Sequence, residues 1–159
     1  MEAPASAVEL GRRLLEEAEE GRLLAANIHD NPVCTVNFDP RIPGIVVIWK
    51  RYVTSLQLRF VHEKVLEMIV EHGAHKILGD DTDLSVIHPR DQEWILNDWM
   101  PRAFSAGLKA AASKRPSGYF GRLSTTSIQS QAVKLVHQAF DDLASAREWL
   151  IRCDVAPCS

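Results

Sequence analysis

The residues whose types and spacing most readily suggest chemistry are Asp80–Asp81–Thr82–Asp83, which directly follow the apolar stretch 75–79. Carboxylates at the end of a strand can bind Mg²⁺, a hard cation that prefers oxygen ligands, or attack a phosphoryl group. They can equally accept hydrogen bonds from the amides of their own loop and cap the next helix. The sequence allows both a reactive site and the polar end of a buried strand, and we favour the second.

The reactive alternative rests on a short motif. Asp81-Thr82-Asp83 has the D-x-D form of the first motif of haloacid-dehalogenase-type phosphatases, which it resembles. That family also needs a downstream lysine and an acidic pair, for which Lys134 and Asp141–Asp142 are the candidates. In that family the motif lies on the first core strand, whereas here about half of the chain precedes it. A Mg²⁺-dependent phosphatase using Asp81 and Asp83 is therefore kept as an alternative.

A second polar loop follows the next strand. Lys114 and Arg115 precede a helix expected to begin near Ser117, an arrangement that can hold an anion. If loops 80–88 and 114–118 lie side by side, they form one polar rim where open α/β sheets bind ligands. The residues we expect at this binding rim are Asp80, Asp81, Asp83, Ser85, His88, Trp94, Lys114 and Arg115.

Two tryptophans follow the acidic loop. Trp94 and Trp99 are five residues apart, or about 140° apart around a helix, so one ring should face the sheet and the other should not. Together with Met100 and Phe104, Trp99 could line a pocket or a partner surface.

The elements that must position these residues are read from the hydrophobic pattern. Strands are expected at 33–38, 45–50, 75–79, 108–113 and 133–140. Helices are expected at 54–72, 89–107, 119–131 and from 142 onward. Pro101 lies inside the second helix and should kink or break it near Asn97–Met100. Strand–helix alternation after a first β-hairpin predicts an α/β fold with a mixed sheet of four to five strands and crossover helices.

An extra helix precedes this pattern. Ser6 and Glu9 can form a capping box, and Gly21 can end the helix. We assign residues 1–22 to this leading helix and 23–159 to one α/β domain, because a chain of 159 residues suits a single domain. The leading helix or an exposed sheet edge could join two copies, so a homodimer is a secondary prediction.

The composition narrows the class of protein. The net charge of −3, with acids and bases mixed along the chain, argues against a nucleic-acid partner. Three cysteines, an odd number, argue against a disulfide framework and favour the cytoplasm. No run reaches the ~20 apolar residues of a membrane span, and the N-terminus lacks the features of a signal peptide. His72-x-x-His75 lacks the glutamate of a zincin motif, so no metal or other cofactor is expected.

Three segments carry a resemblance to a known family. They are GIVVIWK (44–50), the stretch from KILGDDTDL to LKAAAS (76–113) and FDDLASAREWL (140–150). Over residues 33–151 the chain resembles the STAS-like, or SpoIIAA-like, group of small bacterial proteins, and most closely its standalone members of unknown role. The resemblance implies a four- or five-stranded mixed sheet with helices packed against it. It also brings an overlap with the CRAL-TRIO lipid-binding fold.

The chain departs from that group at its regulatory turn. Anti-sigma-factor antagonists of the group are switched by phosphorylation of a serine in a D-S-S-G-like turn. Here Asp80–Ser85 contains no Ser-Gly pair, and Thr82 and Ser85 are the nearest hydroxyls, so the switch is not carried over. We expect a non-enzymatic regulatory protein that binds a protein partner or a small apolar ligand. The alternatives are the Mg²⁺-dependent phosphatase and a small lipid carrier.

Overall fold

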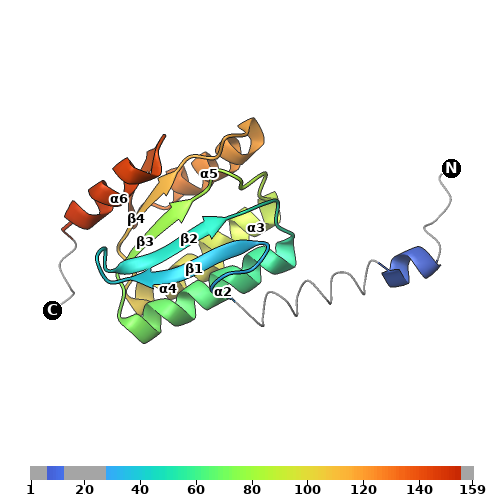
Figure 1. Cartoon of the computed structure of the whole chain (residues 1–159), viewed down its shortest axis with the longest axis horizontal. Coiled ribbons are helices and arrows are strands. Elements are labelled where there is room, and N and C mark those ends of the chain that lie inside the picture. Colours follow the sequence, from blue (N-terminus) through green and yellow to red (C-terminus); the bar gives the residue numbers. More distant parts are fainter. Residues whose placement is uncertain (1–6, 13–27, 155–159) are drawn as a thin grey trace.

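The computed structural model describes residues 7–12 and 28–154 (Figure 1). The strands are β1 (Cys34–Asp39), β2 (Gly44–Trp49), β3 (Lys76–Asp80), β4 (Ala110–Lys114) and β5 (Val136–Phe140). The helices are α2 (Ser55–His72), α3 (Pro89–Trp94), the π-helix η1 (Ile95–Trp99), α4 (Met100–Ala106), α5 (Tyr119–Gln131) and α6 (Leu143–Arg152). The predicted order of strands and helices is confirmed from the first strand onward.

All five strands belong to one sheet, in the order β1-β2-β3-β4-β5. β1 and β2 form an antiparallel hairpin, and β2, β3, β4 and β5 run parallel to one another. Each parallel pair is joined through helices, as parallel strands require. The α/β fold with a mixed sheet and an N-terminal hairpin is therefore confirmed, with five strands.

Helices cover the two faces of the sheet unequally (Figure 1). α6 packs against β3, β4 and β5, where Leu78 and Ala112 meet Ala146 and Leu150. The larger core lies on the other face, between the sheet and the helices from α2 to α5. Because side chains alternate along a strand, the neighbours of Leu78 and Ala112 in sequence point into this larger core.

Local signals set the ends of α2. Thr54 and Gln57 form a capping box at its start, with the Gln57 amide donating to the Thr54 hydroxyl over 3.2 Å. Gly73 ends the helix in the left-handed conformation, with φ of 59°, which glycine adopts without steric cost. The helix expected at 54–72 is thus confirmed, with Thr54 as its cap.

The helix after the acidic loop changes its pitch. It begins at Pro89 and ends at Gly107, as expected, but its middle turn widens to a π-helix over Ile95–Trp99. Pro101 has no amide hydrogen to donate to the preceding turn, and a wider turn accommodates that loss while the helix continues. The irregularity expected near Asn97–Met100 is present, although the chain does not break there.

Residues 7–12 are helical, and the remainder of the leading helix predicted at 6–21 lies outside the described residues. The division into a leading helix and one domain therefore stays a prediction. Across residues 7–12 and 28–154, none of the helices combines the length and the apolar character needed to cross a membrane.

Candidate ligand-binding cavity

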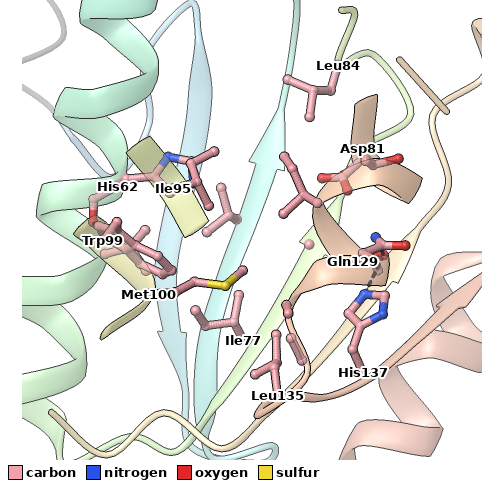
Figure 2. Close-up of a pocket in the computed structure, with 18 of the residues that line it drawn as sticks. His62, Ile77, Asp81, Leu84, Ile95, Trp99, Met100, Gln129, Leu135 and His137 are labelled. Atoms are coloured by element: carbon pink, nitrogen blue, oxygen red, sulfur yellow. Dashed lines mark hydrogen bonds between the residues drawn. The ribbon is translucent and has the colours of Figure 1, made fainter. Parts of the chain in front are cut away.

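A cavity of about 170 Å³ lies between the sheet and the helices of the larger core (Figure 2). The strands contribute side chains from the face that points away from α6, among them Val47 and Ile77. Opposite them, Ile95 and Trp99 come from η1 and Met100 from the start of α4. The wide π-turn therefore supplies part of the wall, and such turns occur often at functional sites.

Small residues in the middle of the sheet help to leave this space. Gly79 on β3 and Ala111 on β4 both line the cavity, where larger strand residues would fill it. Protein interiors are otherwise close-packed, and voids of this size are few in a domain. The small residues on these two neighbouring strands, β3 and β4, therefore leave room for the cavity.

Asp81 faces the cavity directly after β3 (Figure 2). Its backbone is fixed because its amide donates to the Lys114 carbonyl over 3.2 Å and its carbonyl accepts from the Leu84 amide over 3.0 Å. The residue is only 9% exposed. Burial, and secondarily the charge of Asp80, raises the pKa of the Asp81 carboxyl to about 7. Near neutral pH this carboxyl is therefore partly protonated.

The Asp81 carboxyl has no hydrogen-bond donor among the residues that the structure describes. Nearby donors bond elsewhere: the Thr82 hydroxyl donates to Asp80 Oδ1 over 2.5 Å, and the Lys114 ammonium donates to that same hydroxyl. Buried polar groups in folded proteins are nearly always hydrogen-bonded. Among the described residues no side-chain oxygen that is fully closed off lacks a partner, so the Asp81 carboxyl is accessible from the cavity that it lines, and a molecule in the cavity can donate to it.

The other polar residues of this wall satisfy one another. The Gln129 amide group donates to Ser113 Oγ over 3.4 Å, and Ser113 Oγ lies 3.3 Å from His137 Nε2. Burial, and secondarily the charge of Arg115, lowers the pKa of His137 to about 4. Neutral His137 can then accept the serine proton at Nε2. Gln129, Ser113 and His137 therefore contact one another through their polar atoms. The Asp81 carboxyl has no such contact with another described side chain of the cavity.

The opposite wall is aromatic (Figure 2). The Trp99 indole N–H donates to the His62 carbonyl over 2.7 Å, and the two rings meet edge to face with centroids 5.0 Å apart. Trp49 also stacks on His62, with the ring centroids 6.1 Å apart. His62 Nδ1 lies 2.8 Å from the Leu58 carbonyl, which can only accept, so Nδ1 carries the proton. Burial lowers the pKa of His62, which keeps the ring neutral.

The two loops expected to form a polar rim do lie side by side. The Ser117 amide donates to the Thr82 carbonyl over 3.1 Å, and the Ser117 hydroxyl donates to it over 2.9 Å. Asp80 is half-buried and accepts from the Thr82 amide over 3.1 Å. Asp80 and Lys114 are thereby joined through Thr82. Of the acids at this rim, Asp80 bonds to its own loop in the way that the favoured interpretation of the sequence expected.

Of the eight candidate residues, only Asp81 lines this cavity. Asp83 is exposed, Ser85 is half-buried in the loop and His88 caps α3 by accepting from the Arg90 amide over 3.1 Å. Arg115 is exposed and pairs with Asp141 over 3.0 Å.

The expected difference between the two tryptophans is confirmed. Trp99 is 4% exposed and lines the cavity together with Met100. Trp94 is half-buried instead, with the guanidinium groups of Arg59 and Arg102 at 5.0 Å and 6.0 Å from its ring. Phe104 lies outside this cavity.

The residues proposed for phosphoryl chemistry are also separated. Asp81 is buried whereas Asp83 is exposed, so the two carboxylates do not converge on one ion. Asp142 caps α6 by accepting from the Ser145 amide over 2.8 Å. Within 7–12 and 28–154, no three histidine, cysteine or acidic side chains gather as metal ligands would.

His62, Ser113, Gln129 and His137 are cavity residues that the sequence analysis missed. They come from four different elements, and no spacing in the sequence links them. The only available signal was the alternation along β4 and β5, which places Ser113 and His137 on the face shared with Gly79.

No model of a known protein family and no curated protein matches the chain. The chain is therefore characterised by its fold and its cavity: it is an α/β protein with a five-stranded mixed sheet, and a mainly apolar cavity with one acid in its wall lies between the sheet and the helices.

Proposed function

We propose that this protein is a non-enzymatic binding protein for a small, mainly apolar molecule that occupies the cavity. The observation that carries the proposal is the combination of apolar walls and the unpartnered Asp81 carboxyl within a volume of about 170 Å³. An apolar protein cavity of roughly 150 Å³ is known to hold benzene. The expected ligand is therefore about the size of one substituted ring.

The volume also favours this function over a lipid carrier. Pockets for drug-sized molecules measure roughly 300–1,000 Å³, and this cavity is smaller. A long acyl chain would need the surrounding helices to move apart. A ring-sized ligand needs no such change.

The polar wall supports binding rather than catalysis. A serine nucleophile needs a base near its operating pH that is itself oriented by a third group. His137, with a pKa of about 4, is a weak base, and Ser113 already accepts from Gln129. The separated carboxylates of Asp81 and Asp83 likewise give no support to the phosphatase alternative.

We further propose that the chain is a relative of the STAS-like group and acts as a cytoplasmic regulator whose ligand state is sensed by a protein partner. The resemblance over 33–151 and the order of the mixed sheet support this kinship at the level of fold. This proposal includes binding to a protein partner and formation of a homodimer.

Binding of toluene and indole to the purified chain tests the proposal. Saturable one-to-one binding should quench or shift the fluorescence of the cavity tryptophans and raise the melting temperature, because a ligand bound only by the folded state stabilises it. Ala111→Leu should abolish binding by filling the hollow. Ala144→Leu, the same change at an exposed position of α6, should leave binding intact. Unchanged binding by Ala111→Leu would overturn the proposal, and so would failure of toluene, indole and benzylamine all to bind.

A further inference from the structure

We propose that the ligand is a small aromatic amine: one ring on a short arm that ends in a protonated amino group hydrogen-bonded to Asp81. This inference rests on the proposed function and adds the chemical class of the ligand.

The charged residues around the cavity favour a cationic ligand. Among the described residues that line it, Asp81 is the only acid, and none is a lysine or an arginine. The two cationic side chains that follow β4 have partners outside the cavity, Lys114 the Thr82 hydroxyl and Arg115 the Asp141 carboxylate. The protein thus places a carboxyl in an apolar hollow without supplying its counter-charge.

The free-energy cost of burying an ionised carboxylate also favours an amine. An ionised carboxylate in an apolar site is unfavourable unless it is paired and hydrogen-bonded. A protonated amine supplies the opposite charge and several N–H donors at once. The resulting pair is neutral overall, wherever the shared proton resides. A carboxylate ligand would instead place a second negative charge beside Asp81.

The positions of the acid and the aromatic rings favour a ligand with one ring and a short arm. Asp81 and the aromatic pair His62 and Trp99 lie on opposite sides of the cavity (Figure 2). A ring packed against Trp99 therefore directs a short substituent toward the carboxyl. Aromatic rings pack favourably edge to face or offset, as His62 and Trp99 already do with each other.

Four probes with the same ring and different head groups test the inference on the full chain: benzylamine, benzyl alcohol, toluene and benzoate. Dissociation constants are measured by calorimetry at pH 8, above the Asp81 pKa of about 7. Benzylamine should bind at least about tenfold more tightly than toluene, as a charge-assisted hydrogen bond predicts, and benzoate should bind most weakly. Asp81→Asn should bind benzylamine no better than toluene, whereas Asp83→Asn should keep the wild-type ranking.

The outcomes separate the two proposals. Toluene binding with no preference for benzylamine, or equal binding of benzyl alcohol and benzylamine, would overturn the amine assignment and leave the cavity a site for apolar rings. Binding of none of the four would overturn both. The wild-type ranking decides the question even if Asp81→Asn folds poorly, and retained toluene binding by that variant shows that its cavity is intact.

Discussion

Asp81→Asn should make the protein more stable at alkaline pH and change the pH dependence of its unfolding. In the folded protein the carboxyl has a pKa of about 7, against an ordinary value of 3.8, because it is buried beside Asp80. A carboxyl whose pKa is raised by folding favours the folded state at low pH. That contribution is fully present below 3.8 and is lost as the pH rises to about 7. Asparagine keeps the shape of the side chain and cannot ionise.

The magnitude follows from linkage. The acid dissociation constant of Asp81 is lower in the folded state than in the unfolded state, and each tenfold change in it corresponds to about 1.4 kcal/mol. The shift of the pKa from 3.8 to about 7 therefore destabilises the folded protein by about 4 kcal/mol at high pH. Between pH 5 and pH 8 the wild-type protein should therefore lose roughly 2.5 kcal/mol relative to Asp81→Asn. His137 acts in the opposite direction, because its pKa of about 4 in the fold lies below its ordinary 6.5. The comparison of variant with wild type cancels that contribution.

Urea unfolding followed by tryptophan fluorescence at half-unit pH intervals measures this difference, since Trp49 and Trp99 are both buried. Asp83→Asn makes the same chemical change at an exposed carboxyl and should not reproduce the pH-dependent difference. If the free-energy difference between Asp81→Asn and wild type is the same at pH 5 and pH 8, the Asp81 carboxyl is not held in an apolar site.

Two further changes test the packing around the site. Gly121→Ala should destabilise the protein by about 1–3 kcal/mol, because the added Cβ would lie 2.5 Å from the Leu84 carbonyl oxygen where α5 contacts the acidic loop. Gly118→Ala, with nothing within 4 Å of its Cβ, is the matched control in the same urea experiment, and equal losses at both positions would contradict the close contact. Thr54→Ala removes the capping box of α2 and should cost about 1 kcal/mol, whereas exposed Thr126→Ala should cause no loss. A Thr54→Ala midpoint equal to wild type would show that the cap does not contribute.

The fold could be predicted from the sequence because its signals are local. The capping residue Thr54, the prolines and the glycines Gly73 and Gly107 mark helix ends through backbone conformations that neighbouring residues determine. The β-branched runs predict the strands. Their alternation with helical patterns leaves few possible topologies, and the mixed sheet is one of them. The last strand begins at Val136, later than expected, since the exposed Val133 belongs to the connection before it.

The site depended on information that the sequence does not hold locally. The run of acids correctly marked the end of β3, but only the folded loop decided that Asp81 turns inward while Asp83 faces solvent. Ser113 and His137 meet because β4 and β5 pair in one register, and Trp99 reaches the cavity through a π-turn. Chemical environment is a property of three-dimensional neighbours. The sequence therefore determined the sheet, its helices and the acid at its edge, whereas packing between distant elements decided that a hollow remains and that this acid is left in it without a partner.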